Sequence, residues 1–140
     1  MIYALKAEDG HVAIMQISEG ADIDAEVAKF AEVNWHPVSV TPIDPATIPQ
    51  DRSYRNAWAV SDKGISHDMG KAREIHKDKL RAERTSLLAR LDVEQLKAIS
   101  SADGTKIGEI EKEKQRLRDI TKDARIAAAT SIDALKAITV

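Results

Sequence analysis

The segment from Asp51 to Trp58 (DRSYRNAW) gathers the side chains that are best suited to molecular contact. It combines two guanidiniums, two aromatic rings and an amide, and Arg, Tyr and Trp are enriched at the energetic centres of protein interfaces. We therefore predict that Arg52, Tyr54, Arg55 and Trp58 bind a partner. The alternative is structural: the two rings close the core of a small β region while the arginines pair with nearby aspartates.

A second charged feature lies between residues 71 and 90, which hold seven basic and three acidic side chains. A helix with this net charge can lie against phosphate groups, and Arg81 and Arg84 stand one turn apart. Intrahelical ion pairs or an anionic protein partner, including the acidic N-terminal region of the same chain, use the same charges. Signals for base stacking or for a helix-turn-helix are missing. We predict Arg81, Arg84, Arg116 and Arg118 as charged contacts to a protein.

The residues that could support catalysis or metal binding are sparse and badly spaced. No histidine pair has the spacing of helical metal ligands, there is no cysteine, and no glycine-rich phosphate loop or nucleophile motif occurs. A cluster of His67, Asp68 and Glu74 is better explained as a turn residue followed by a helix cap. We therefore predict no catalytic residue, no metal, no cofactor and no enzymatic activity. The four histidines are His11, His36, His67 and His76.

The elements that must position these side chains begin with a β-hairpin and a helix. Ile2–Ala7 and His11–Ile17 are β-prone, and Asp9-Gly10 between them favours a tight turn because glycine accepts positive φ. Apolar residues recur at helical spacing over Ala21–Val33, with Asp22 or Asp24 as N-cap. This pattern predicts a short amphipathic helix that packs on the hairpin.

The segment from Trp35 to Pro49 carries all four prolines, so Val38 and Val40 can form only an edge strand or an extended connector. A second hairpin is predicted with strands at 57–60 and 65–67, because Ser61-Asp62-Lys63-Gly64 between them has turn composition.

The pattern becomes helical at Asp68, which is a good N-cap. One long helix follows, and the capping-box sequence at 92–95 predicts that it restarts there and runs to about Ser100. Asp103-Gly104 is a turn before a helix with an apolar stripe. A capping box at 130–133 opens a last short helix. The stripe consists of Ile107, Ile110, Leu117 and Ile120.

These elements predict an α+β fold with a small α+β region at 1–67 and a helical region at 68–140. All five aromatic residues lie in the first 58 positions, and residues 1–70 carry five basic and eleven acidic side chains against sixteen and twelve in residues 71–140. No apolar run approaches the roughly 20 residues of a membrane-spanning helix, and the N-terminus shows no signal-peptide pattern. We expect a soluble protein without a membrane partner.

Four stretches together resemble a group of small phage and prophage proteins that are associated with tail or tail-fibre genes, such as tail assembly chaperones. They share an order of motifs that covers residues 51–140. The resemblance implies an assembly role and no active site. The stretches are DRSYRNAW at 51–58, DMGKAREIHKDKLRAERTSLLARLD at 68–92, KQRLRDIT at 114–121 and AAATSIDALKAI at 127–138.

We therefore expect a structural or assembly protein of a phage tail or tail fibre, acting through contacts with other tail or fibre proteins. The resemblance implies a location in the host cytoplasm during assembly or in the tail of the virion. The stripe of Ile107, Ile110 and Leu117 can also support a homo-oligomer. The alternative is a nucleic-acid-binding phage regulatory protein that uses the basic helix at 71–90.

Overall fold

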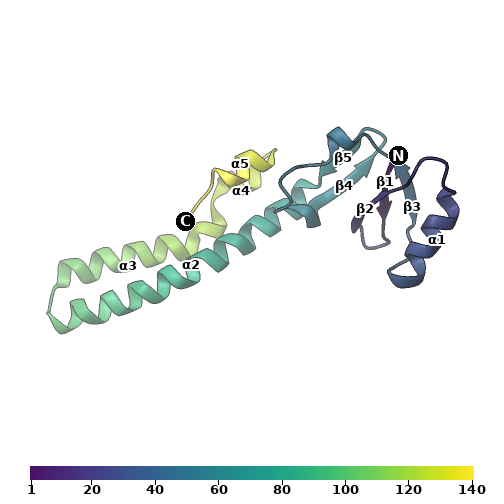
Figure 1. The fold of residues 1–140 in the computed structure, drawn as a ribbon. Helices are drawn as coiled ribbons and strands as arrows, with labels where there is room; N and C mark the ends of the chain where they lie inside the picture. Colours follow the sequence, from purple (N-terminus) through teal and green to yellow (C-terminus); the bar gives the residue numbers. More distant parts are fainter. The chain divides into compact units, whose positions relative to one another are not determined.

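A three-stranded antiparallel sheet begins the chain in the computed structural model, which describes all 140 residues (Figure 1). Strand β1 (Ile2–Lys6) lies in the middle, between β2 (Val12–Gln16) and β3 (Ser39–Pro42). Gly10 has a φ of 89° in the β1–β2 turn, where its N–H donates to the carbonyl of Ala7. The predicted hairpin and the predicted edge strand are confirmed.

A second, two-stranded sheet pairs β4 (Trp58–Ser61) with β5 (Gly64–His67), as predicted. Gly64 has a φ of 108°, which residues with a side chain rarely adopt. A Cβ at this position would also clash with the side chain of Thr47. Short 3-10 helices at Pro45–Thr47 and Arg55–Ala57 precede this sheet.

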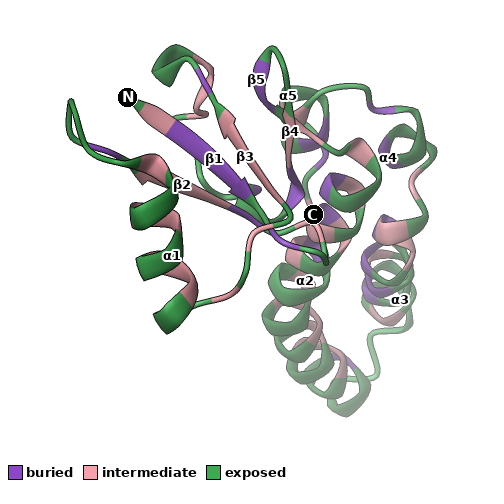
Figure 2. Ribbon diagram, turned by 90° about the vertical axis from the view of Figure 1, so that its right-hand side faces the viewer, coloured by how far each residue is buried: buried purple, intermediate pink, exposed green.

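The core of the N-terminal part lies between the two sheets. Alternate residues of β1 point to opposite faces, and the face that carries Ala4 packs with Trp58 and Ile65. The opposite face carries Leu5, which is fully buried. Helix α1 (Ile23–Val33) lies beside the sheet in Figure 2 and begins at the predicted N-cap Asp22, whose carboxylate accepts from the N–H of Asp24.

A helical hairpin forms most of the C-terminal part. Helix α2 (Met69–Ser100) follows the predicted N-cap Asp68. Helix α3 (Gly104–Asp119) follows the predicted turn at Asp103-Gly104, where the Asp103 carboxylate accepts from the N–H of Lys106 and so caps the helix. The prediction that α2 restarts near Asp92 is wrong, because α2 is one continuous helix of 32 residues. Packing overrides the capping-box signal: Leu80, Ala98, Ile110 and Leu117 are buried in the hairpin.

The chain ends in short helical turns. A 3-10 turn at Ile120–Lys122 leads into α4 (Ala124–Ala128) and α5 (Ile132–Lys136). The predicted short helix is present, but its cap lies one residue later than the capping box at 130–133 implies, because the Ser131 hydroxyl accepts from the N–H of Ala134. Backbone carbonyls of this segment accept hydrogen bonds from Arg73 and His76 of α2, and these bonds hold the segment in place.

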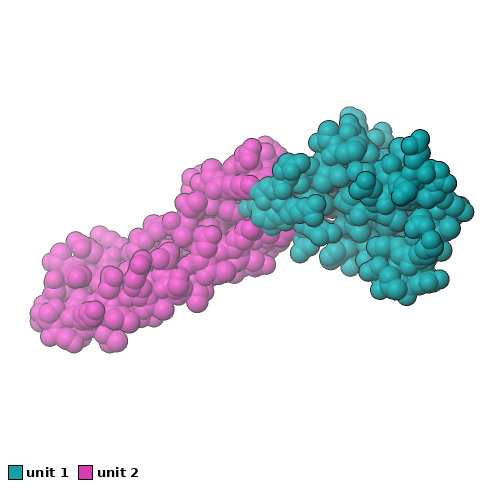
Figure 3. Space-filling view, in the orientation of Figure 1, with its two compact units in different colours: residues 1–72 teal, residues 73–140 magenta.

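The chain divides into two compact units, which are coloured separately in Figure 3. Unit 1 comprises residues 1–72 and unit 2 residues 73–140. The sequence placed the change at Asp68, whereas the first residues of α2 belong to unit 1 by their contacts. Unit 1 contains six basic and eleven acidic side chains, and unit 2 contains fifteen and twelve.

Candidate functional site

The aromatic rings of the DRSYRNAW segment are interior residues of unit 1. Tyr54 and Trp58 are each 2% exposed, and Trp58 belongs to the core between the sheets. These two rings therefore do not form the contact surface that we predicted, and their burial fits the structural alternative. Trp58 is the largest side chain of that core.

The two arginines of the same segment remain at the surface of unit 1. Arg52 and Arg55 are exposed, and the guanidinium carbon of Arg55 lies 5.8 Å from the centre of the Trp58 ring. This distance suits a cation–π contact, which orients Arg55 along the surface. Of the four contact residues predicted in this segment, only these two are available to a partner.

The basic part of α2 uses many of its charges within the chain. Arg81 pairs with Asp78 at 2.6 Å and Lys77 with Glu74 at 3.2 Å, while Arg73 donates to the carbonyl of Ala129 at 2.9 Å. The intrahelical pairs that the sequence allowed are therefore present. They leave fewer free cations for phosphate groups than the composition indicates.

The other predicted arginines contact α3. Arg84 donates to the carbonyls of Leu117 and Arg118, at 3.3 and 2.8 Å. These bonds give hydrogen-bond donors to two backbone carbonyls in the last turn of that helix, which have no partner within it. Arg118 pairs with Glu111 at 2.9 Å, and Arg116 with Glu113 at 2.6 Å. The structure thus joins Arg84 to the backbone of Arg118. The side chains of Arg81, Arg116 and Arg118 each pair within their own helix.

A stripe of exposed apolar side chains on α2 was missed in the sequence. Val93, Leu96 and Ile99 are 52%, 65% and 56% exposed. Their spacing of three residues places them on one side of the helix, while Ala98 is buried and Gln95 bonds across to α3. The spacing was readable, but only the position of α3 shows that this side of α2 is uncovered. We call these three residues the α2 stripe.

Beside the α2 stripe, a buried lysine fixes the hairpin. Lys114 of α3 is an ion-pair partner of Asp92 at 2.6 Å and donates to the side-chain oxygen of Gln95 at 2.8 Å. The amide of Gln95 in turn donates to Glu111 at 3.2 Å. This network sets the register of α2 against α3, because each polar group has a specific partner.

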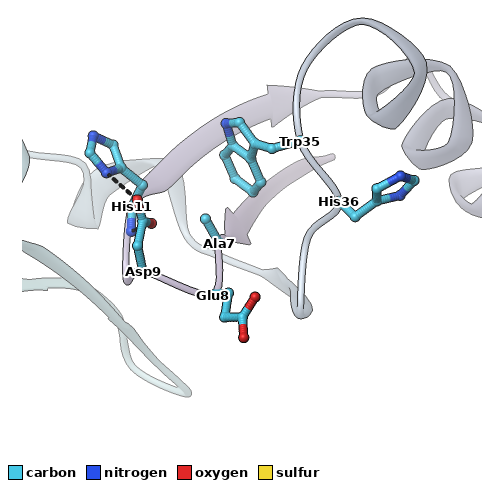
Figure 4. A pocket seen from close by; sticks show the side chains of 6 residues that line it. All are labelled: Ala7, Glu8, Asp9, His11, Trp35 and His36. Atoms are coloured by element: carbon cyan, nitrogen blue, oxygen red, sulfur yellow. Dashed lines mark hydrogen bonds and ion pairs between the residues drawn. The ribbon is translucent and has the colours of Figure 1, made fainter.

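A hollow of about 850 Å³ opens on the surface of unit 1. It is lined by Ala7, Glu8, Asp9, His11, Trp35 and His36, which Figure 4 shows as sticks. The ring of Trp35 is half-buried and meets Phe30 edge to face, with 5.0 Å between the ring centres. No local sequence pattern connects Trp35 with the β1–β2 turn, because the two are distant in the chain.

The electrostatics of this hollow are set by the β1–β2 turn. The N–H of His11 donates to the Asp9 carboxylate at 2.9 Å, and this bond lowers the pKa of Asp9, with smaller contributions from the His11 ring and Lys71. The carboxylate of Asp9 is therefore ionised at neutral pH.

The arrangement of titratable side chains offers no built metal centre: no group of three or more His, Asp or Glu side chains is placed to hold a metal ion. His76 is buried and donates to the carbonyl of Ile138 at 2.8 Å, a contact that holds the C-terminal segment. None of the helices combines the length and apolarity that crossing a membrane requires.

Comparison of the chain with protein-family models, with curated proteins and with solved structures gave no match.

Proposed function

We propose that this chain is an assembly protein of a phage tail or tail fibre, and that it binds a helix of another tail or fibre protein through the α2 stripe. The phage context comes from the resemblance of residues 51–140 to small tail-associated phage proteins. The mode of binding comes from the single observation that carries the proposal, the exposure of Val93, Leu96 and Ile99 together on one side of α2.

The physical argument rests on the cost of leaving these side chains in water. Burying a Val, Leu or Ile side chain fully contributes about 1.5–3 kcal/mol. Isolated exposed apolar residues are common on protein surfaces, but a continuous group marks a contact site. A helix that presents apolar residues at this spacing suits a partner helix or an apolar groove.

The stripe adds an apolar surface to the contact residues that the sequence suggested, of which Arg52 and Arg55 remain exposed. Tyr54 and Trp58 are buried, and Arg81, Arg84, Arg116 and Arg118 make contacts within the chain. In unit 2 the α2 stripe therefore provides the apolar part of recognition, and the exposed Arg90 and Lys97 near the stripe are available to orient a partner.

The test compares Leu96→Gln with Ala82→Gln in cells that produce the phage encoding this chain. Ala82 is an exposed residue of the same helix outside the stripe, so both variants add the same polar side chain to α2. We expect the unaltered chain and Ala82→Gln to co-purify with tail or fibre proteins, identified by mass spectrometry. Leu96→Gln should reduce this co-purification at least fivefold without reducing the helical circular dichroism signal.

Equal co-purification of tail proteins by Leu96→Gln and Ala82→Gln would contradict the role of the stripe. Absence of tail or fibre proteins from every sample would contradict the assembly function itself. Mass spectrometry of purified virions then separates two forms of the proposal, because a tail component stays in the particle and a chaperone does not.

A further inference from the structure

The hollow in unit 1 has the charge of a cation-binding site. Glu8 and Asp9 contribute two carboxylates to its lining, which also contains His11 and His36 but no lysine or arginine. An anionic ligand would be repelled. The wider surface agrees with this, since unit 1 has eleven acidic and six basic side chains and so attracts a basic partner.

Trp35 gives the hollow a flat aromatic wall. Phe30 holds the indole edge to face, with an angle of 87° between the ring planes, and a ring fixed in this way loses little entropy on binding. Figure 4 shows the Trp35 ring lying over Ala7, from which the chain continues directly to Glu8 and Asp9. A group that enters the hollow meets an aromatic face and carboxylates together.

We propose that this hollow binds the guanidinium of an arginine side chain presented by a protein partner. The guanidinium stacks on the Trp35 ring and donates to the carboxylate of Glu8. The carboxylate of Asp9 adds to the negative potential but already interacts with His11 and with the nearby Lys71. Glu8 therefore provides the main ion pair to the guanidinium.

Arginine suits the hollow better than lysine for a geometric reason. Its guanidinium is planar, weakly hydrated and able to stack on an aromatic face while its edge donates hydrogen bonds. An ammonium group is compact and strongly hydrated, so that it would lose more solvation on entering a hollow lined by Trp35 and Ala7. A neutral sugar could also stack on the indole, but the paired carboxylates would add no charge attraction to it.

This inference is independent of the proposed function, because it uses residues of unit 1 alone while the α2 stripe lies in unit 2. The hollow can therefore bind arginine whether or not the stripe binds a tail protein. The two experiments have separate readouts, so a failure of either one does not decide the other.

The experiment follows the two indole N–H signals of the full chain by ¹H–¹⁵N NMR while N-acetylarginine amide is added. Trp58 is 2% exposed, so its signal is an internal control for non-specific effects. We expect the Trp35 signal to move in a saturable way and the Trp58 signal to stay in place. Glu8→Gln should weaken binding about fivefold, and raising the salt concentration should weaken it further.

Matched controls and competing ligands decide the result. Glu19→Gln removes an exposed carboxylate outside the hollow and should leave binding unchanged. The proposal is overturned if the Trp35 signal does not move, or if Glu8→Gln and Glu19→Gln behave alike. It is also overturned if N-acetyllysine amide or N-acetylglucosamine binds as tightly as the arginine amide.

Discussion

Lys114 and Asp92 form an ion pair whose two partners have very different surroundings. The side chain of Lys114 is 10% exposed, whereas that of Asp92 is 61% exposed. Removing one member of a pair leaves the other charge without its partner, and this costs much free energy only when the remaining charge is buried away from water. The two halves of this pair should therefore respond unequally to substitution.

We predict that Asp92→Asn destabilises unit 2 more than Lys114→Met does. Asp92→Asn leaves a buried ammonium with Gln95 as its remaining partner, at a cost of about 1–2 kcal/mol in the free energy of unfolding. Lys114→Met keeps the apolar stem and leaves a solvated carboxylate, so it should change stability by less than about 1 kcal/mol. Urea unfolding followed by circular dichroism measures both values.

Lys112→Met is the matched control for this comparison, because Lys112 is an exposed lysine of the same helix. Its effect should stay within about 0.5 kcal/mol. A larger loss of stability for Lys114→Met than for Asp92→Asn would contradict this prediction. It would show that Lys114 stabilises unit 2 more through packing of its side chain than through its ion pair with Asp92.

At the scale of elements, α3 is held by side-chain hydrogen bonds to its acidic residues. Arg118 and Gln95 donate to Glu111, Arg116 donates to Glu113, and Gln115 and Lys122 donate to Asp119. In each case the hydrogen bonds lower the pKa of the carboxyl group. The helix therefore favours the ionised forms, which ties its stability to pH.

We predict that α3 becomes less stable in acid, below the ordinary glutamate pKa of 4.5. A carboxyl whose pKa is lower in the folded chain than in the unfolded chain contributes stability above the unfolded value, and that contribution disappears as the pH falls through the folded value. The urea concentration at the midpoint of the helical signal should decrease as the pH is lowered from 6 to 3. Glu113→Gln should make this fall smaller.

Glu109→Gln provides the control for the pH experiment, since it removes an exposed carboxylate of α3 outside these pairs. It should retain the pH dependence of the unaltered chain. If Glu113→Gln shows the same pH dependence as Glu109→Gln, the Arg116–Glu113 pair does not contribute to it.

At the scale of the whole molecule, two units share one chain and can be observed separately. All five aromatic residues lie in the first 58 positions, so tryptophan fluorescence reports unit 1. The far-ultraviolet circular dichroism signal comes mainly from α2 and α3. In unit 2 the C-terminal segment is anchored by the buried Ile138, whose carbonyl accepts from His76.

We predict that a chain ending at Lys136 loses stability in unit 2 and not in unit 1. It lacks Ile138, whose removal costs about 2–4 kcal/mol, and it leaves His76 without this acceptor. The unfolding midpoint by circular dichroism should fall while the fluorescence midpoint stays unchanged. Ile138→Val should give a smaller loss of about 0.5–1.5 kcal/mol, and an equal fall of both midpoints would mean that the units unfold together.

Turns and helix starts were predictable from the sequence, because a few neighbouring residues determine them. Asp9-Gly10 predicted the first hairpin, and Asp22 and Asp68 cap the helices that they were expected to cap. The starts of the helices after Asp103-Gly104 and near Thr130 were also expected, although the capping residues there are Asp103 and Ser131. The continuity of α2 through Asp92 was not predictable in this way. There the packing against α3, together with the pair to Lys114, outweighs a local capping signal.

The candidate surfaces were the least predictable part, because exposure depends on what the rest of the chain covers. The composition of DRSYRNAW indicated a contact site, but Tyr54 and Trp58 are buried in unit 1. Leu96 and Leu80 look alike in the sequence, yet α2 exposes the first and buries the second. The hollow exists only because Trp35 returns to the turn at Glu8 and Asp9.

The sequence by itself determined the α+β class, the two hairpins, the starts of the main helices and the concentration of aromatic residues near the N-terminus. These properties follow from backbone preferences and hydrogen bonds between residues close together in the chain. Only the tertiary structure decided which rings are core, which arginines are engaged and which apolar side chains face solvent. Each of those outcomes depends on contacts between distant segments, whose meeting no local pattern specifies.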